Sequence, residues 1–475
     1  MNLNEQYLLD NKINEECGVF GIYNAPEPAA SLSYFGLHAL QHRGQQAAGI
    51  AASDGENIRC VKDKGLLAEV FNMQVIDELK GSHALGHVRY STAEDNQIEN
   101  VQPIMVRAHM GHFAVAHNGL IVNAPELKKE LEYKGSIFQG NSDSELIAHM
   151  IQMEEGSFSE KIMKACNRFE GAFAFVIMTK DCMYAVRDKN GFRPLAFASI
   201  ENGYAFASET CAFDIINANY LKDVEPGELI RVSEEGVKYL KYTDETQIKM
   251  CAMEYIYFAR PDSNIDGINV HTARRLSGQA LAAVEEYEGD IVIGVPDSSL
   301  SAAIGYAEKS GLPYEIGLIK NRYVGRTFIQ PTQKQRERGV RMKLSAVKSI
   351  VNGKRVFMID DSIVRGTTSK RIVQLLKEAG AKEVHVRIGS PALTYPCFYG
   401  VDTSTFDELI SSRKSCDEVC EFIGADSLKF LEVDQMQDAF KTHNICTSCF
   451  NGVYPTKLFS YGRILEEEKE KKANE

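Results

Sequence analysis

The segment that most constrains the fold spans residues 354–376 and reads KRVFMIDDSIVRGTTSKRIVQLL. It joins a short apolar strand to two acids, a loop of small hydroxyl residues and the start of a helix. A strand followed by a loop and a helix is the repeating unit of a parallel sheet with crossover helices. The amides of such a loop and the positive end of the next helix favour a bound phosphate. The segment therefore predicts an α/β domain with an anion site where a strand ends.

The same alternation runs through the second half of the chain from about Gly289. DIVIGVPDSS is followed by SAAIGYAEKSG, and the helix after RGTTS is followed by EVHVRI. Apolar side chains repeat on one face of that helix, and Gly380 is its stop signal. This face consists of Ile372, Val373, Leu375, Leu376 and Ala379. The second half is therefore expected to form a doubly wound parallel sheet.

The first half has a different pattern. From Cys17 to about Asp244, short apolar strands such as CGVFGIY, HFAVAHN, FAFVIM and YAFAS are separated by turns, with helical stretches such as ELIAHMIQM between them. This pattern indicates layered sheets with helices outside. The pattern changes between Thr243 and Cys251. We expect a removable leader at 1–16, one domain at 17–245 and a second at 246–475.

Composition excludes several classes of protein. A chain of 475 residues can fold into two or three domains that each bury a core. Lys plus Arg number 53 against 65 for Asp plus Glu, so the net charge of -12 disfavours nucleic acid as a partner. No apolar run approaches the roughly 18 residues of a membrane helix, and the polar opening MNLNEQYLLDNKINEE fits no signal or transit peptide. We expect a cytoplasmic protein with no membrane partner.

Cys17 is a candidate nucleophile because it follows the polar leader directly and opens an apolar strand. Cleavage before Cys17 would give one residue both a thiol and an α-amine, whose pKa of about 8 suits a general base. Taken alone, a cysteine at this position is more often a small buried hydrophobe. Four further segments favour catalysis: LQHRGQQAAGI, GHVRYST, HNGLIVN and NSDSE.

Together with Cys17, these segments resemble the N-terminal-nucleophile glutamine amidotransferases, whose mature chains begin with Cys-Gly. The resemblance covers nearly all of residues 17–240 and implies an αββα sandwich. It implies that Cys17 attacks the glutamine amide. Thiolate attack creates an oxyanion that needs two fixed donors, and the resemblance assigns these to the Asn118 side chain and the Gly119 backbone NH.

The same resemblance implies the residues that bind glutamine. Arg89 would bind the α-carboxylate and Asp143 the α-ammonium group, because each charge needs an opposite partner in a small pocket. Arg43 and Gly44 would shape the pocket wall. Taken singly, Arg89 fits a surface salt bridge and Asp143 fits a helix N-cap. Glu94 stands where this family commonly has Gly, so the local loop geometry is expected to differ.

In the second half, the acids and the hydroxyl loop resemble the motif of type I phosphoribosyltransferases that binds phosphoribosyl pyrophosphate (PRPP). The two acids can bind ribose hydroxyls or a Mg²⁺ held by pyrophosphate oxygens. The resemblance makes VPDSS, residues 295–299, the pyrophosphate loop, with Ser298 near the metal. The implied Mg²⁺ set is Ser298, Asp360 and Asp361. The implied PRPP-binding loop is Arg365, Gly366, Thr367, Thr368 and Ser369.

Residues 320–344, KNRYVGRTFIQPTQKQRERGVRMKL, are unusually basic for an acidic protein. Their charge suits a polyanionic substrate, and the resemblance implies a flexible lid that closes over PRPP. An exposed basic loop without function is the alternative. The candidate phosphate contacts are Lys320, Arg322, Arg326, Arg341 and Lys343.

Eleven cysteines with irregular spacing favour catalysis, metal binding or core packing over disulfides in a reducing compartment. Cys446 and Cys449 form a CxxC pair, for which Zn²⁺ with four thiolates is the generic choice. Together with Cys251 and Cys397, they resemble the iron-sulfur branch of the glutamine PRPP amidotransferases. This resemblance implies a [4Fe-4S] cluster, which four thiolates suit, with a structural or oxygen-sensing role. The other predictions are that Cys416 and Cys420 are bystanders on a helix and that Cys60, Cys166, Cys182 and Cys211 belong to the core.

The two halves together imply one coupled reaction. Glutamine hydrolysis at Cys17 would release ammonia, which would pass through a closed passage to the ribose C1 of PRPP. The products would be 5-phosphoribosylamine, glutamate and pyrophosphate, at the entry step of purine synthesis. The resemblance further implies a homotetramer and feedback inhibition by purine nucleotides such as AMP, ADP, GMP or GDP.

Two other functions are compatible with parts of the pattern. Ammonia could be aimed at a sugar phosphate or an acyl adenylate, but the RGTTS loop argues against that enzyme. The second half could instead be a non-enzymatic sensor of PRPP or nucleotides. The acidic charge and the complete set of glutaminase residues argue against the sensor.

Overall fold

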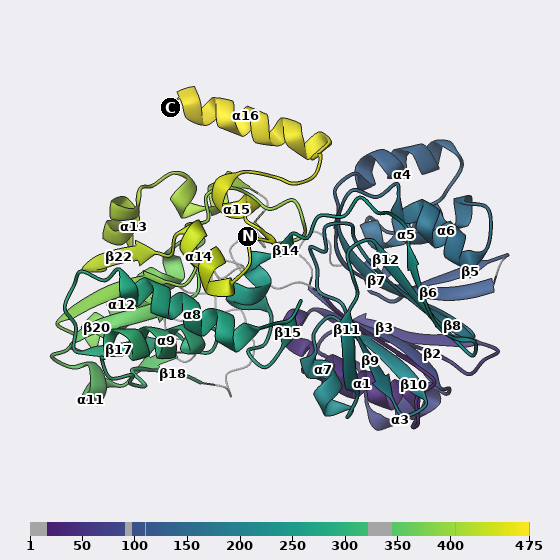
Figure 1. The fold of residues 1–475 in the computed structure, drawn as a ribbon, viewed down its shortest axis with the longest axis horizontal. Helices are drawn as coiled ribbons and strands as arrows, with labels where there is room; N and C mark the ends of the chain where they lie inside the picture. The colour runs from purple at the N-terminus through teal and green to yellow at the C-terminus, as the bar shows by residue number, and fades with distance from the viewer. Residues whose placement is uncertain (1–16, 91–96, 110, 322–343, 404, 475) are drawn as a thin grey trace.

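The computed structural model describes residues 17–90, 97–109, 111–321, 344–403 and 405–474. Two lobes lie side by side, one built from each half of the chain (Figure 1). Within these ranges, no helix has the length and apolar character needed to cross a membrane.

The first lobe contains two antiparallel sheets. The seven-stranded sheet has the order β11-β9-β10-β1-β4-β2-β3, and the six-stranded sheet has the order β13-β12-β8-β7-β6-β5. The first sheet comprises β1 (Gly18–Tyr23), β2 (Ala47–Ser53), β3 (Ile58–Lys64), β4 (His83–Arg89), β9 (Ala196–Ile200), β10 (Gly203–Ala207) and β11 (Asn219–Asp223). The second comprises β5 (Ile104–Ala108), β6 (Gly111–Ile121), β7 (Gly171–Thr179), β8 (Cys182–Arg187), β12 (Glu228–Ser233) and β13 (Gly236–Lys241).

Helices cover both outer faces of this pair of sheets. A core of side chains from both sheets, including Val19 and Val176, fills the space between them. The outer face of the seven-stranded sheet packs against α1 (Ala29–Ala39). The outer face of the six-stranded sheet packs against α5 (Asp143–Met153) and α6 (Phe158–Cys166). This arrangement confirms the expected αββα sandwich. The remaining helices here are α2 (Leu67–Val70), α3 (Met73–Glu78), α4 (Ala124–Tyr133) and α7 (Cys211–Ile215).

The second lobe is built on a parallel sheet with the order β17-β20-β21-β22. In β20, Phe357 and Ile359 pack with α8 and α9, while Val356 and Met358 pack with α12 and α13. Successive side chains of a strand point to opposite faces, so helices cover both sides of the sheet. This confirms the doubly wound prediction. The elements are β17 (Ile291–Gly294), β20 (Arg355–Asp360), β21 (Glu383–Ile388), β22 (Ser427–Phe430), α8 (Val270–Ala283), α9 (Leu300–Ser310), α12 (Thr367–Glu378) and α13 (Cys416–Ile423).

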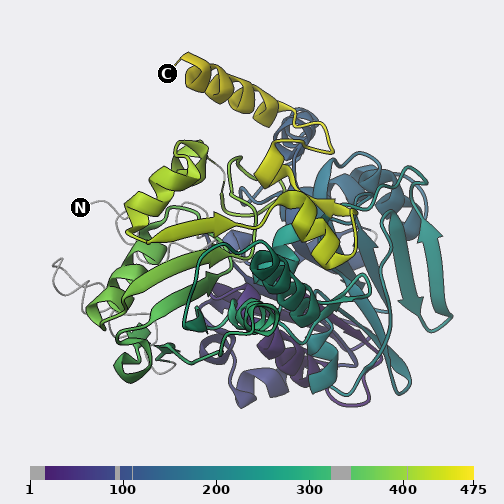
Figure 2. The ribbon, with the colours of Figure 1, turned by 60° about the vertical axis from the view of Figure 1, so that its left-hand side comes forward.

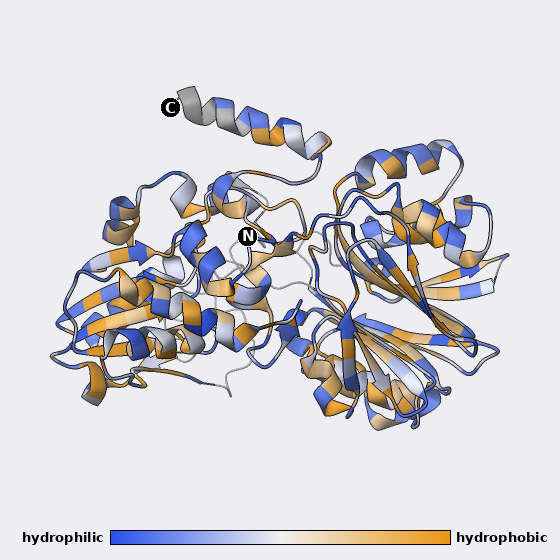
Figure 3. Cartoon of the chain, viewed as in Figure 1, coloured by the Kyte–Doolittle hydropathy of each residue, from blue (hydrophilic) through white to orange (hydrophobic). Residues whose placement is uncertain are grey.

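Short elements complete the second half. Apolar colour concentrates in the strands of both lobes (Figure 3), whereas α16 projects above the body in both ribbon views (Figures 1 and 2). The short strands are β14 (Met250–Cys251), β15 (Asn264–Ile265), β16 (Ile268–Asn269), β18 (Leu318–Lys320), β19 (Leu344–Ala346) and β23 (Ile445–Cys446). The further helices are α11 (Lys348–Val351), α14 (Val433–Phe440), α15 (Ser448–Asn451) and α16 (Ser460–Asn474).

The lobes are joined by apolar and charged contacts. The rings of Phe192 and Tyr399 stack with centroids 4.2 Å apart. Arg187 of the first lobe donates two hydrogen bonds, of 2.8 and 2.9 Å, to the carboxylate of Asp266 in the turn between β15 and β16. These contacts hold the two lobes against each other.

Candidate active sites

Cys17 lies at the start of β1, beside the end of β4. Gly18 pairs with Val88 in the antiparallel register, so Cys17 stands next to Arg89. The half-buried thiol lies 3.8 Å from the carbonyl oxygen of Tyr90. The carbonyl oxygen of Cys17 accepts a 3.2 Å hydrogen bond from Nε of Arg43. The nucleophile candidate is therefore held through its own backbone.

Asn118 and Gly119 lie on β6, in the opposite sheet. The side chain of Asn118 is buried, and in the described part of the chain neither its amide nitrogen nor its amide oxygen has a hydrogen-bond partner. Native proteins seldom leave buried polar groups unpaired, so such a group points to a missing ligand. Gly119 has a φ of 136°, which favours glycine. A buried amide side chain without a partner in the described structure thus stands next to a glycine whose backbone conformation other residues rarely adopt.

Asp143 is the first residue of α5 rather than its cap. Ser142 caps this helix through a 3.2 Å bond from the Ser144 amide, so the alternative N-cap role for Asp143 is wrong. The Asp143 carboxylate accepts a 2.9 Å bond from the Ile121 amide and lies 3.7 Å from Nδ1 of His117. It thereby lies beside the end of β6 that follows the Asn118–Gly119 pair.

Arg89 is 5% exposed and ends β4. Gly44 packs directly on it, since a Cβ at position 44 would lie 2.6 Å from the Arg89 backbone. The structure therefore brings Cys17, Arg89 and Gly44 together at one sheet edge. Glu94 and the leader at 1–16 lie outside the described residues.

Arg43 differs from its expected place on the pocket wall. Its guanidinium is fully buried and pairs with Glu209 and Glu254, each at 2.8 Å. These carboxylates raise the pKa of Arg43 although burial acts in the opposite direction. Neither acid is among the residues that the sequence motifs single out. The available signal was an acid next to an otherwise apolar run, in YAFASET and in AMEYIYF.

The second site begins where β20 ends. Ser299 donates a 3.0 Å hydrogen bond to Asp360, and Ser298 donates to Asp361. Ser362 also donates to Asp361, at 2.8 Å. Since β17 and β20 are adjacent parallel strands, the loops that follow them meet at one edge of the sheet. The predicted pyrophosphate loop and the paired acids therefore form one cluster of oxygen groups.

The hydroxyl loop leads into α12, as the sequence predicts. Gly366 is the N-cap residue with a φ of 74°, and a Cβ there would come within 3.1 Å of Ile410. Thr367 is exposed, Thr368 is half-buried and Ser369 is buried. Arg365 forms an ion pair with Glu408, so its guanidinium has a protein partner in this structure.

Lys320 lies at the end of β18, and its Nζ is 3.1 Å from the carboxylate of Asp297 in the predicted pyrophosphate loop. The preceding Pro296–Asp297 peptide bond is cis. A cation thus lies at this loop, as expected. The other basic candidates, Arg322, Arg326, Arg341 and Lys343, lie outside the described residues.

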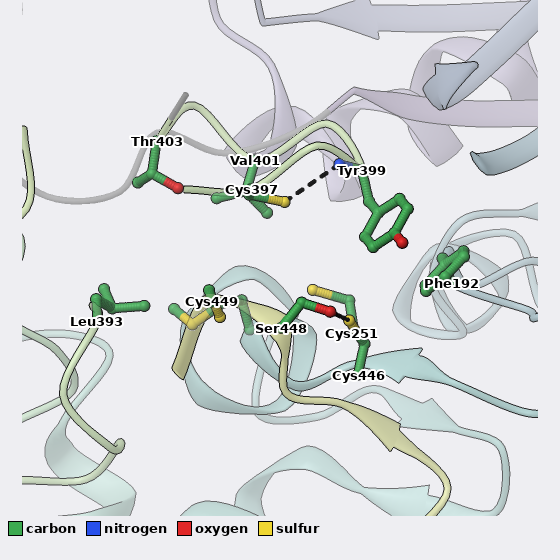
Figure 4. A pocket seen from close by; sticks show the side chains of 11 residues that line it. Phe192, Cys251, Leu393, Cys397, Tyr399, Val401, Thr403, Cys446, Ser448 and Cys449 are labelled. Carbon is green, nitrogen blue, oxygen red and sulfur yellow. Dashed lines mark hydrogen bonds between the residues drawn. The ribbon is translucent and has the colours of Figure 1, made fainter. Parts of the chain in front are cut away.

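Four cysteines line one cavity at the boundary between the lobes. Cys397 lies on one side and Cys251, Cys446 and Cys449 lie on the other (Figure 4). Cys251 and Cys446 are paired residues of β14 and β23. Phe192 of the first lobe and Tyr399 of the second close the cavity with apolar surface. Four segments that are distant in the sequence thus meet at the predicted cluster site.

The thiols of this cavity influence one another. Burial raises the pKa of Cys449, and the nearby Cys446, Cys397 and Cys251 raise it further. Within the described ranges, no group of three or more His, Cys, Asp or Glu residues is arranged to hold a metal ion. None of the eleven cysteines, all of which lie in the described ranges, forms a disulfide.

The remaining cysteines follow most of their predicted places. Cys416 and Cys420 lie on α13, as expected. Cys166, Cys182 and Cys211 are buried. Cys60 is partly buried on the edge strand β3 and packs against the core between the two sheets.

Comparison with known proteins matches both lobes. Residues 87–214 match the glutamine amidotransferase domain family, and residues 269–388 match the phosphoribosyl transferase domain family. The amidophosphoribosyltransferase of Bacillus subtilis (strain 168) is 54% identical over 456 residues, which cover 94% of this chain and 95% of that protein. The enzyme of the same name from Staphylococcus epidermidis strain RP62A is 50% identical over 458 residues, which cover 94% and 92%.

Solved structures agree with this relationship. The glutamine PRPP amidotransferase of B. subtilis in complex with ADP and GMP superposes with a TM-score of 0.89 at 52% identity, covering 94% of this chain and 98% of that one. A structure described as the allosteric regulatory enzyme of purine biosynthesis superposes with a TM-score of 0.90 at 53% identity, covering 94% and 97%. The chain therefore belongs to the amidophosphoribosyltransferase family, the enzymes that use glutamine and PRPP in the first step of purine synthesis.

Proposed function

We propose that Cys17, exposed as the N-terminal residue, hydrolyses glutamine and that the second lobe transfers the released ammonia to PRPP. The observation that carries the first half of this proposal is the buried Asn118 amide without a partner. A tetrahedral oxyanion would take the Asn118 side chain and the Gly119 amide as its donors. The proton of the Cys17 thiol would pass to the α-amine of the same residue.

Recognition of glutamine would rest on opposite charges. Arg89, at the end of β4, would bind the α-carboxylate, and Asp143 would bind the α-ammonium group. The position of Arg89 beside Cys17 supports this assignment. Arg43 would hold the backbone of Cys17 through its Nε hydrogen bond and would not contact the substrate directly.

PRPP would bind at the edge of the parallel sheet, with phosphate oxygens at the start of α12 and the ribose near the paired acids. Thr367, Thr368, Ser369 and the Gly366 backbone would hold the 5-phosphate. Lys320 would neutralise the pyrophosphate, together with Arg322 and the basic residues that follow. Arg365 would contact the pyrophosphate only after its ion pair with Glu408 is broken.

A Mg²⁺ ion fits the donor set at this edge. Asp360, Asp361 and Ser298 supply only oxygen atoms, the ligand type that Mg²⁺ prefers. When bound, Mg²⁺ would neutralise charge on the departing pyrophosphate oxygens. Asp360 and Asp361 would hold this charge close to the ribose. Ammonia would attack C1 of the ribose as the C1–oxygen bond to pyrophosphate breaks.

We further propose a [4Fe-4S] cluster in the cysteine cavity. Cys251, Cys397, Cys446 and Cys449 line one cavity, and four thiolates are the ligand set of such a cluster. Four thiolates can also hold a single Zn²⁺, so the iron and zinc content of the purified protein distinguishes the two. The cluster would join Cys251, Cys397 and the segment of Cys446 and Cys449, all in the second half of the chain, as a structural or oxygen-sensing group.

Other features of the family are proposals for this chain. We propose a leader at 1–16 and domains at 17–245 and 246–475. The break between β13 and β14 supports the boundary between the two domains. The ADP and GMP bound to the B. subtilis relative support inhibition by purine nucleotides at the PRPP site and beside it. A homotetramer and a cytoplasmic location complete the proposal.

The test follows both products at once. Anaerobically purified, leader-processed protein is given glutamine with and without PRPP and Mg²⁺, and glutamate and pyrophosphate are measured. We expect both to appear in equal amounts and only when PRPP and Mg²⁺ are present. Glutamate formation without pyrophosphate would refute the coupled reaction.

A further inference from the structure

The guanidinium of Arg43 lies between the nucleophile and two buried carboxylates. Its Nη1 donates to Glu209 at 2.8 Å and to Glu254 at 2.9 Å, and its Nη2 donates to Glu254 at 2.8 Å. Its Nε donates to the carbonyl oxygen of Cys17 at 3.2 Å. The two-bond pair with Glu254 fixes both the position and the plane of the guanidinium.

The two carboxylates come from different parts of the chain. Glu209 follows β10 in the first lobe, and it also accepts bonds from the Arg260 amide at 2.8 Å and from the Ser263 hydroxyl at 2.7 Å. Glu254 opens the helical turn η6 (Glu254–Phe258), three residues after Cys251 of the cysteine cavity. The backbone of Cys17 is thus tied, through one side chain, to the second half of the molecule.

Charge within this group is balanced. Arg193 also approaches Glu254, at 3.4 Å, so two buried guanidinium groups face two buried carboxylates. His42 lies 2.7 Å from Glu209 at the more exposed end. Burial alone would raise the pKa of Glu209, but His42 and Arg43 outweigh it and hold that pKa below its usual range. Loss of one carboxylate would leave an uncompensated buried charge beside Cys17.

The turn that carries Glu254 also reaches the second site. Ile256 lines a small cavity together with Ser298 and Asp361. One short turn therefore carries both a carboxylate of the Arg43 group and a side chain that lines a cavity at the proposed PRPP site.

We propose that Glu254 is a positioning residue for the glutaminase reaction: through Arg43 it fixes the backbone of Cys17, so that the thiol attacks from one defined place. This inference rests on the proposed role of Cys17. Glu209 supports the same guanidinium from the first lobe. Glu254 is the more informative of the two acids because it belongs to the second half, whereas the residues of the glutamine site belong to the first.

The test compares Glu254→Gln with Glu254→Asp in the full chain. The Gln variant keeps the shape and loses the charge, while the Asp variant keeps the charge on a shorter side chain. Glu285→Gln is a matched control, because Glu285 forms a two-bond pair with Arg387, at 2.6 and 2.8 Å, entirely within the second lobe. Glutamate release from glutamine, pyrophosphate release with ammonia as the nitrogen source, and the melting temperature are measured for each.

We expect Glu254→Gln to lower kcat for glutamine at least about tenfold, the scale of one lost charge-assisted hydrogen bond. Ammonia-dependent pyrophosphate release should change less than about twofold, because that reaction does not use Cys17. Glu254→Asp should recover part of kcat, and Glu285→Gln should lower neither rate selectively. The rate at which iodoacetamide alkylates Cys17 should also change about tenfold in Glu254→Gln and should stay at the wild-type value in Glu285→Gln.

Equal losses in the glutamine and ammonia reactions would mean a general structural defect and would overturn the inference. Unchanged glutamine kinetics and unchanged alkylation in Glu254→Gln would also overturn it. Failure of the wild-type protein to release pyrophosphate with ammonia and PRPP would instead contradict the proposed function. In that case the alkylation rate of Cys17 still decides the role of Glu254.

Discussion

Gly119 and Ala172 approach so closely that a Cβ on Gly119 would lie 2.2 Å from the carbonyl oxygen of Ala172. With a φ of 136°, position 119 is also strained for any other residue. Gly119→Ala should therefore displace the proposed oxyanion donor. We expect the glutamine-dependent rate to fall about 100-fold, the scale of one lost donor, with ammonia-dependent pyrophosphate release retained.

Gly111→Ala is the matched control for this variant. Gly111 lies on the same strand, has a φ of 116°, and has no atom within 4 Å of its added Cβ. Gly111→Ala should introduce the strain of a positive φ but no steric clash like the one between residue 119 and Ala172. An equal loss of glutamine-dependent activity in both variants would contradict the role given to Gly119.

Asn118 allows catalysis to be separated from stability. Its amide is buried without hydrogen-bond partners in the described structure, so Asn118→Leu removes a polar group that does not stabilise the fold. We expect kcat for glutamine to fall about 100-fold or more, while the free energy of unfolding stays the same or rises. Chemical denaturation and glutamate release measure the two effects.

The control for Asn118 is Asn123→Leu. Asn123 donates to the Arg168 carbonyl and accepts from the Glu170 amide, both at 2.9 Å. Its loss should cost about 1–3 kcal/mol of stability, because two partly buried backbone groups lose their partners. A larger destabilisation by Asn118→Leu than by Asn123→Leu would show that the Asn118 amide stabilises the fold, and would contradict its proposed role as an oxyanion donor.

Asp223 should make stability depend on pH. Burial, then the neighbouring Asp266, raise its pKa to about 6. The unfolded chain has a lower value, near about 4, so the folded protein binds the proton more tightly and loses stability as pH rises from about 4 to about 6. Asp223→Asn removes this loss and can still accept from the Tyr220 hydroxyl, which lies 2.8 Å away.

We therefore expect Asp223→Asn to be more stable than the wild type at pH 7 by about 1–3 kcal/mol. The stability advantage of Asp223→Asn should shrink as pH falls toward about 4, because the side chain at position 223 is then neutral in the folded wild type as well as in the variant. Denaturation midpoints measured across this range test the sign. An advantage that grows toward low pH would contradict the assignment.

The proposed cluster predicts that the cysteines of the cavity, and not the other cysteines, are needed for iron to bind. Cys251→Ser and Cys397→Ser should lose iron, inorganic sulfide and visible absorbance after anaerobic purification, and should melt at lower temperature because the group that joins the three cysteine segments is lost. Cys416→Ser and Cys420→Ser on α13 are the controls. They should keep the iron, the inorganic sulfide, the visible absorbance and the melting temperature of the wild type. Equal iron in all four variants, or zinc without iron in the wild type, would overturn the cluster assignment.

Much of the fold could be predicted because its signals are local. The apolar run before Asp360 and the hydroxyl loop after it indicate a strand, a turn and a helix, and β20 and α12 follow them closely. The alternation of Val356, Phe357, Met358 and Ile359 between two cores follows from burial of the strand on both faces.

The site was predictable only as far as its motifs reach. Asn118 and Gly119 are adjacent in the sequence, and their positions follow from one strand. The bonds from Glu209 and Glu254 to Arg43 join residues that are 166 and 211 positions apart. No periodicity in one sequence pairs such distant charges, so the partners of Arg43 emerge only from the fold.

The most direct test of the central claim follows the nitrogen atom. Glutamine labelled with ¹⁵N in the side-chain amide is turned over with PRPP and Mg²⁺ in a large excess of unlabelled ammonium, and the nitrogen isotope in phosphoribosylamine is measured after chemical trapping. If ammonia passes inside the protein from Cys17 to the second lobe, the product carries ¹⁵N with little dilution. Product nitrogen that matches the solution ammonium would contradict the coupled account.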